Sequence, residues 1–178
     1  MTRLVILFAL VMTATVPAAA GECRATLRPL LTDTAPDPAA LAAVRSVCRA
    51  EADAGDADAL YQLALFHLGL GGEWQPAAAI PMITEAAAAG VPEAQYWLGW
   101  QHESGDLLER DEAVALGWYQ RAASANHRLA LARLADAYLS GELGLPRDAV
   151  LAAEFRARQA LCLRPALATT GAATSTGD

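Results

Sequence analysis

The sequence predicts an all-α protein, an α/α solenoid of about three helix-pair repeats with an N-terminal capping helix. Apolar residues recur at helical spacing through most of the 178 residues. The same set of small and large side chains returns every 35 or 36 residues, and a glycine or asparagine closes most of the helical stretches. Self-similarity at such a period is typical of solenoids, in which each repeat buries its apolar face against its neighbours.

Residues 1–20 are expected to be a cleaved signal peptide. Arg3 precedes an uncharged apolar run, residues 4–16, and three alanines follow at residues 18–20 as a small-residue cleavage site before Gly21. A membrane anchor is the alternative, but a span needs about 20 apolar residues. An arginine-only, alanine-rich composition is associated with GC-rich bacterial genomes, so we expect a periplasmic protein without stable membrane insertion after cleavage.

Residues 21–37 are expected to form an N-terminal connector, because Pro29 and Pro36 bracket a turn-rich stretch. The repeat domain, residues 38–163, is expected to begin with the capping helix. Asp37 supplies an N-cap and Pro38 a first helical position for that helix. Residues 164–178 hold Thr, Ala, Gly and Ser without an apolar face, which predicts a disordered tail.

Three repeats are expected at about residues 56–90, 91–126 and 127–163. The first helix of each carries an alanine with a leucine four residues later: Ala59 with Leu63, Ala94 with Leu98, and Ala130 with Leu134. The second helix carries a large residue, which is Met82, Trp118 or Phe155. We therefore predict that Trp118 is a core residue whose replacement by alanine costs about 3–5 kcal/mol. In the first copy Pro81 falls within the second helix and is expected to delay or kink it.

The middle copy carries the pattern most fully. It reads Ala94, Leu98-Gly99, His102, Gly105, Asp111, Ala115, Trp118, Ala122-Ala123 and Asn126. This pattern resembles the Sel1-like repeat, a relative of the tetratricopeptide repeat, with His102 in place of a tyrosine and Asn126 in place of a glycine. The resemblance covers roughly residues 38–163. It implies a helical scaffold, in a family that includes exported regulators of sensor kinases and assembly factors of envelope complexes.

Charge and motif content argue against several function classes. All 13 positive side chains are arginines, and with 20 acids the net charge is −7, so a phosphate backbone is repelled and nucleic acid is a poor partner. His67, His102 and Tyr138 share one repeat position, which the family fills with an aromatic ring, and no histidine pair has metal-ligand spacing. The absence of lysine excludes a Schiff base. We expect no catalytic residue, no metal and no cofactor.

The surface of the first helices is the expected binding face, because helical repeats commonly bind along it. Positions away from the packing residues are aromatic in the middle copy, and aromatic residues and arginine dominate interfaces. The partner-binding candidates are Tyr61, Gln62, Tyr96, Trp97, Trp100, Arg133 and Asp136. The alternative for the two tryptophans is packing between helices.

We expect a non-catalytic adaptor or regulator that binds a protein or peptide partner in the cell envelope. A peptidoglycan-ligand binding protein or cell-wall hydrolase is the alternative. Three cysteines follow the signal peptide, and export permits disulfides. Because the first and last units of a solenoid do not touch, a Cys23–Cys48 bond is predicted, with Cys162 left over. The alternative is three unpaired thiols.

Overall fold

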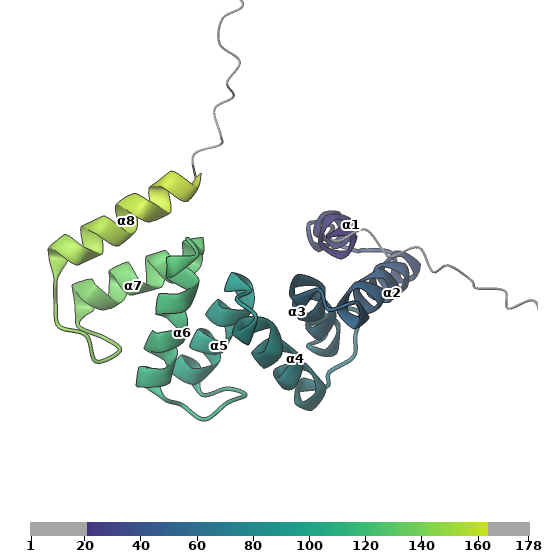
Figure 1. Ribbon diagram of the computed structural model, residues 1–178, viewed down its shortest axis with the longest axis horizontal. Helices are drawn as coiled ribbons and strands as arrows, with labels where there is room; N and C mark the ends of the chain where they lie inside the picture. The colour runs from purple at the N-terminus through teal and green to yellow at the C-terminus, as the bar shows by residue number, and fades with distance from the viewer. Residues whose placement is uncertain (1–20, 164–178) are drawn as a thin grey trace, which may run out of the picture.

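The computed structural model describes residues 21–163. Within that range the chain forms eight helices: α1 (Glu22–Leu31), α2 (Pro38–Asp53), α3 (Ala57–His67), α4 (Pro76–Ala88), α5 (Pro92–Ser104), α6 (Glu112–Ser124), α7 (Arg128–Ser140) and α8 (Ala149–Leu163). Successive helices fold back on one another and stack into a curved array that runs from α1 to α8 (Figure 1). Each helix packs mainly against the next one along the chain, and α1 also reaches α3. The structure therefore confirms the predicted α/α solenoid.

Polar side chains begin most of the helices. Asp37, Asp56 and Asp111 each accept a hydrogen bond from a backbone N–H in the first turn of α2, α3 and α6. His127 does the same for α7. Each bond satisfies a donor that the first turn of a helix leaves without a partner. At the end of α6, Asn126 adopts a left-handed φ of 60°, as its cap position predicts.

The leucines predicted for the first helices lie in the core. Leu63, Leu98 and Leu134 are all buried, together with the alanines four residues before them. Gly99 lies at a close contact between α5 and α6, since a Cβ atom there would be 2.8 Å from the Tyr119 ring. Small and large side chains therefore interlock between neighbouring helices as the repeat pattern predicts.

Helix α4 does not start late at Pro81. It begins at Pro76, whose missing N–H has no helical partner at the first position in any case, and it continues through Pro81 to Ala88. The second proline removes one hydrogen bond from the helix, and α4 nevertheless continues and packs against α3 and α5.

Trp118 is not the buried aromatic residue of α6. It is half-buried, and the Arg121 guanidinium lies 4.6 Å from its ring centroid. The next residue, Tyr119, is 1% exposed and fills the core instead. One residue turns the side chain by about 100° around a helix, and the repeat register alone does not tell which of two adjacent rings faces inward. The expected 3–5 kcal/mol therefore applies to Tyr119.

The segment 21–37 is not simply a connector, because it contains α1. Cys23 and Leu27 of α1 are buried at a spacing of 36 residues from Ala59 and Leu63 of α3. Helices α1 and α2 thus form a further helix pair that precedes the three predicted ones. Pro29 lies inside α1 and the helix holds only two buried residues, so its periodic signal in the sequence is weak.

The predicted disulfide joins Cys23 on α1 to Cys48 on α2. Both cysteines are buried, whereas Cys162 at the end of α8 is exposed and unpaired. No helix of the described residues is both long and apolar enough to cross a membrane. The expected signal peptide, residues 1–20, and the expected disordered tail, residues 164–178, lie outside the described part of the chain.

Candidate functional site

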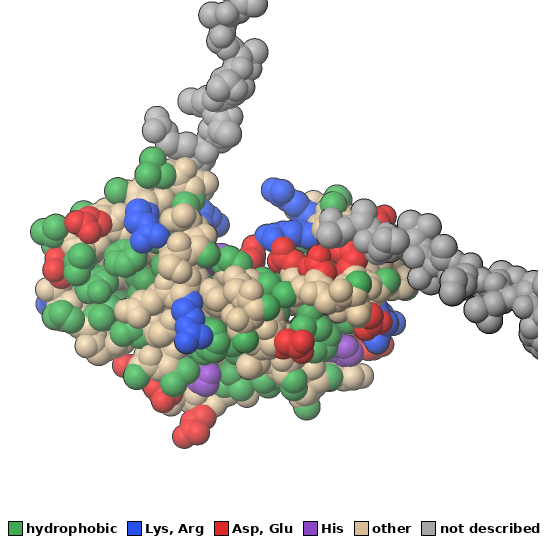
Figure 2. Space-filling model, viewed as in Figure 1, with side chains coloured by type: hydrophobic (Ala, Val, Ile, Leu, Met, Phe, Trp, Pro, Cys, Tyr) green, Lys and Arg blue, Asp and Glu red, His purple; other side chains and the backbone are tan. Residues whose placement is uncertain are grey.

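The seven candidate binding residues do not form one continuous surface. Two of them lie in a pocket between α1 and α3, two lie in a groove beside α5, and three are held in contacts with other side chains. The molecule is visibly hollowed between α1 and α8, and arginine side chains gather on the rim of this hollow over α1 (Figure 2). Because the groove and the pocket differ in polarity, they are suited to different ligands.

The α1–α3 pocket has a volume of about 450 Å³ and is lined by Arg24, Leu27, Arg28, Leu31, Tyr61, Gln62, Leu65 and Glu93. Of the two candidates there, Gln62 is buried, which leaves little of it to a partner. Removal from water, reinforced by the Glu93 carboxylate, raises the pKa of Tyr61 to about 12. Arg24 already pairs with Asp58 at 2.9 Å and with Glu93. Arg24 is therefore already paired, whereas the second carboxylate oxygen of Glu93 is buried without a hydrogen-bond partner among the described residues.

The second place is a tryptophan groove of about 380 Å³, lined by Leu68, Trp74, Trp97, Trp100, Gln101, Asp106 and Leu107. Trp97 is half-buried and packs against the core, whereas Trp100 is 46% exposed. Trp74 comes from the loop between α3 and α4 and is 62% exposed. An isolated antiparallel bridge between Leu68 and Trp74 holds that loop closed. The groove therefore presents two exposed indole rings on a defined backbone.

The polar groups of the tryptophan groove are few. The Gln101 side-chain oxygen accepts a hydrogen bond from the Leu107 backbone N–H at 3.1 Å, which ties α5 to the following loop. Asp106 is the one charged residue among those that line the groove. None of residues 21–163 forms an ion pair with Asp106. The groove is thus apolar with a single free negative charge at its wall.

Two of the remaining candidates contact other side chains of the array. The Tyr96 ring lies 5.6 Å from the Tyr119 ring and 4.8 Å from the His127 ring, measured between centroids. It therefore packs between α6 and the start of α7. Asp136 is exposed and pairs with Arg156 of α8 at 2.8 Å. Its contact joins the last two helices at the surface.

Arg133 belongs to a network that joins α5, α6 and α7. It pairs with Glu103, and with Glu142 at 2.8 Å. The Tyr119 hydroxyl donates to the Glu103 Oε2 atom at 2.7 Å, and the Arg133 Nε group donates to the same oxygen at 3.1 Å. Burial of Glu103 alone would raise the pKa of its carboxyl, but the hydrogen bonds from Arg133 and Tyr119 outweigh burial and lower this pKa. Arg133 is consequently a structural residue more than a free binding group.

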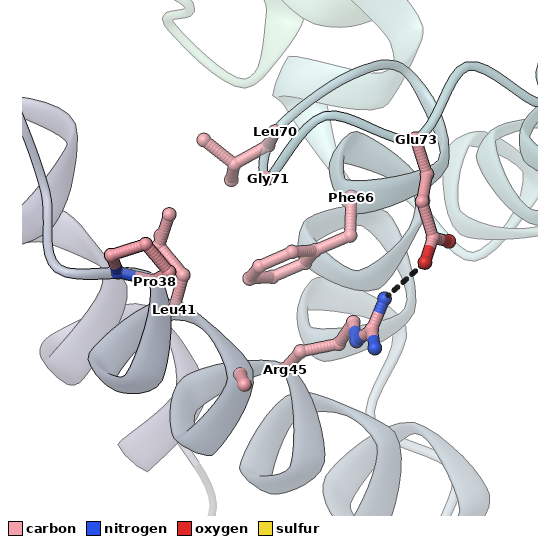
Figure 3. A pocket seen from close by; sticks show the side chains of 8 residues that line it. Pro38, Leu41, Arg45, Phe66, Leu70, Gly71 and Glu73 are labelled. Carbon is pink, nitrogen blue, oxygen red and sulfur yellow. Dashed lines mark hydrogen bonds and ion pairs between the residues drawn. The ribbon is translucent and has the colours of Figure 1, made fainter.

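A pocket that the sequence did not indicate lies between α2 and the loop after α3. Its volume is about 280 Å³, and its lining residues are Pro38, Leu41, Ala42, Arg45, Phe66, Leu70, Gly71 and Glu73. Figure 3 shows the Phe66 ring as its floor and the Arg45–Glu73 ion pair, at 3.2 Å, along its rim. Because the two rim charges neutralise each other, this pocket carries no electrostatic preference for a ligand.

A Sel1 repeat model matches residues 57–91, 92–127 and 128–155 of the chain. The chain belongs to the Sel1 repeat family. The first two segments coincide with the helix pairs α3–α4 and α5–α6, and the third ends within α8. Helices α1 and α2 lie outside the matched segments. Sel1 repeats are generally protein–protein interaction modules, and their fold is typically a non-catalytic scaffold.

Two solved structures show the same fold. A Sel1 repeat protein from Oxalobacter formigenes is 35% identical, with a TM-score of 0.60 over 66% of this chain and 88% of that chain. A protective antigen present in uropathogenic Escherichia coli strains, which displays an SLR fold, is 28% identical with a TM-score of 0.62. That comparison covers 81% of this chain and 31% of the antigen, so this chain spans about a third of the antigen's length.

Two of the three histidines make local structural contacts, whereas the third, His67, has a buried ring nitrogen without a hydrogen-bond partner among the described residues. The ring of His102 is 3.0 Å from the Glu109 backbone oxygen, which joins the end of α5 to the loop before α6. His127 caps α7, and His67 lies at the end of α3. No three metal-ligating side chains converge within the described residues to hold a metal ion.

Sequence reasoning found two of the three tryptophans of the groove and missed Trp74. This residue lies in a loop outside the helix positions that the Sel1 pattern describes, so the repeat register does not place it beside α5. Its residue type is the one indication in the sequence, because a tryptophan in a glycine-rich turn does not occupy a core position of the repeat and is therefore expected at the surface. Likewise, the α1 side of the α1–α3 pocket was not foreseen because α1 itself was missed.

Proposed function

We propose that this Sel1 repeat protein is an exported, non-catalytic adaptor that holds a segment of another envelope protein in the tryptophan groove. The exposure of the groove carries the proposal. Trp74 is 62% and Trp100 46% exposed, and both line the same groove as Trp97. Contiguous exposed apolar surface with a polar rim marks interaction sites, and tryptophan is enriched among the residues that dominate binding energy.

The charge of the groove defines the chemistry of the bound segment. Asp106 forms no ion pair with another of residues 21–163, and the chain as a whole carries a net charge of −7. The face of an indole ring attracts cations, which adds to the pull of a carboxylate. These features fit a segment in which an apolar side chain is followed or preceded by arginine or lysine. An acidic segment would be repelled.

Export is supported by two independent features. The Cys23–Cys48 disulfide is of the kind that persists in oxidising compartments such as the periplasm. Residues 1–20 have the charge, apolar run and small-residue site of a signal peptide. Both features support a periplasmic location for the adaptor.

A peptidoglycan fragment is the alternative ligand, since sugar rings also stack on tryptophan. Two features favour the peptide. Recognition of sugar hydroxyls needs several free polar groups. In the groove the Gln101 side-chain oxygen already accepts a hydrogen bond from Leu107, so Asp106 is the one carboxylate left to bind a hydroxyl. The carboxylates of peptidoglycan stem peptides would also meet the negative charge of Asp106.

The test uses purified protein with its disulfide intact and short peptides that carry the same apolar residues beside arginine, glutamine or glutamate. We expect the arginine peptides to bind best. Trp100→Ala should weaken their binding by about 30-fold, the effect of losing a hot-spot residue worth about 2 kcal/mol. Leu139→Ala, which removes a side chain of similar exposure on α7, is the matched control. Asp106→Asn should remove the preference for arginine.

Equal binding by the wild type and the Trp100→Ala variant would refute the groove as the docking site. Binding of muropeptides that competes with the peptides, and that Trp100→Ala abolishes, would assign the groove to cell-wall ligands instead. Cross-linking in periplasm, with the variant as the reference, then identifies the protein that supplies the bound segment.

A further inference from the structure

Glu51 is a buried carboxylate without a cation beside it. It lies on α2 with 2% of its surface exposed. One of its oxygens accepts hydrogen bonds from the backbone N–H groups of Glu22, at 2.9 Å, and Cys23, at 3.2 Å. The other oxygen lies 3.3 Å from the backbone nitrogen of Gly21. No arginine in the described range 21–163 forms an ion pair with Glu51.

Such an arrangement lacks a full positive charge. Glutamate is almost never fully buried unless it is paired, because an ion taken out of water loses several kcal/mol of hydration. The free N–H groups at the start of α1 carry only about half an elementary charge between them. One position beside the carboxylate can supply the missing charge, and it is the backbone nitrogen of Gly21.

The sequence makes Gly21 the first residue after the expected cleavage site. We propose that Glu51 is the binding site for the α-ammonium group that signal-peptide cleavage creates at Gly21, so that processing completes a buried ion pair. Water hydrolyses the Ala20–Gly21 peptide bond, Ala20 leaves as a carboxylate, and the amine of Gly21 takes up a proton. The inference rests on the proposed export of the chain and goes beyond it by assigning a binding site to the new N-terminus.

The Cys23–Cys48 disulfide also holds the terminus in this place. Cys23, two residues after Gly21, is bonded to Cys48, which lies one helical turn before Glu51 on α2. The disulfide therefore keeps the ammonium close to the carboxylate and reduces the freedom that pairing would otherwise remove.

The chain offers an unusually clean test, because it contains no lysine. Once residues 1–20 are removed, the α-amine of Gly21 is the sole primary amine. A precursor is cleaved in vitro by a protease whose site ends directly before Gly21, and the rate of labelling by an amine-selective reagent is measured against pH. Only the unprotonated amine reacts, so the pH profile gives the pKa of this one group.

We expect the native protein to hold the pKa of the α-amine above its ordinary value of about 7.7–8.0. Each unit of increase slows labelling at pH 7 about tenfold relative to the same chain in urea. Glu51→Gln should restore fast labelling, whereas Glu22→Gln, which changes an exposed acid at the same helix start, should not. A chain that begins at Ala20 keeps Glu51 but moves its amine by one residue, and it should also label fast.

The thermal midpoint gives a second readout. A group whose pKa is raised on folding contributes stability below its unfolded pKa and loses it as pH rises through the folded pKa. The chain that begins at Gly21 should therefore melt at a higher temperature than the chain that begins at Ala20 at pH 7, and the difference should vanish at alkaline pH.

Equal labelling of native and unfolded protein would overturn the inference, as would equal rates for the chains that begin at Gly21 and Ala20. The second comparison decides the matter even where Glu51→Gln fails to fold. The proposed export is tested separately by the N-terminal residue of protein isolated from cells. A terminus other than Gly21 would refute that processing step and, with it, the biological role of the Glu51 binding site. It would not affect the proposed role of the tryptophan groove.

Discussion

Because α5 and α6 approach each other closely at one glycine and not at another, the structure predicts opposite effects on stability when each is replaced by alanine. A Cβ atom at Gly99 would lie 2.8 Å from two ring carbons of Tyr119, whereas nothing lies within 4 Å of a Cβ atom at Gly117. Both glycines lie inside helices, where alanine is favoured by about 1 kcal/mol. The same substitution should therefore destabilise the protein at one position and stabilise it at the other.

The magnitude follows from how little the Tyr119 ring can move. The ring is 1% exposed, and its hydroxyl donates to Glu103 at 2.7 Å. Overpacking a core costs about 1–3 kcal/mol, and an anchored ring favours the upper half of that range. Because the gain in helix propensity offsets about 1 kcal/mol of this cost, Gly99→Ala should lower the free energy of unfolding by about 1–2 kcal/mol. Gly117→Ala should raise the free energy of unfolding by up to about 1 kcal/mol.

Thermal unfolding followed by circular dichroism at 222 nm, a standard helix signal, and urea titration measure the difference. For a domain of this size 1 kcal/mol corresponds to about 2–4 °C, so the two variants should separate by roughly 2–12 °C. A Gly99→Ala variant as stable as Gly117→Ala would mean that α5 and α6 do not approach as described. The reasoning about small residues in the array would then be wrong.

Three other predictions follow from the core and the helix ends. Tyr119→Ala should cost about 3–5 kcal/mol in urea unfolding and the half-buried Trp118→Ala clearly less; equal losses would contradict the assignment of the inward ring. Removing the Cys23–Cys48 bond should cost roughly 3 kcal/mol on the chain-entropy estimate for its loop, and the native oxidised protein should show one reactive thiol after denaturation. Burial lowers the pKa of His127, whose ring accepts the Ala130 N–H. Because the unfolded chain binds this proton more tightly, stability should fall as pH drops below about 6.5, and His127→Asn should remove this dependence.

The repeat register made most of the array predictable. Ala94 and Leu98 return at Ala130 and Leu134, and a helix-pair unit that cannot bury its apolar face alone must stack on its neighbours. The start of α2 at Pro38 and the left-handed cap at Asn126 also follow from residue type. These features are local or periodic, so one sequence contains the information that specifies them.

The features that the sequence did not reveal depend on distances between separate elements. Helix α1 buries only Cys23 and Leu27, and two buried positions are too few to show a period. Tyr119 and Trp118 are neighbours, and only the three-dimensional packing against Gly99 selects between them. The tryptophan groove combines a loop residue of one repeat with helix residues of the next, a proximity that no spacing along the chain encodes.

The two ends of the array differ in how readily they can open to proteolysis. Helix α1 is bonded covalently to α2 by the disulfide, whereas α8 is held by noncovalent contacts alone and exposes Val150 and Leu161. Local opening is the step that admits a protease, and α8 can separate from α7 without the breaking of a covalent cross-link. Among the described helices, trimming should therefore start at α8. The products would keep α3 to α6, so a shortened chain would retain the tryptophan groove and would still compete for the same partner.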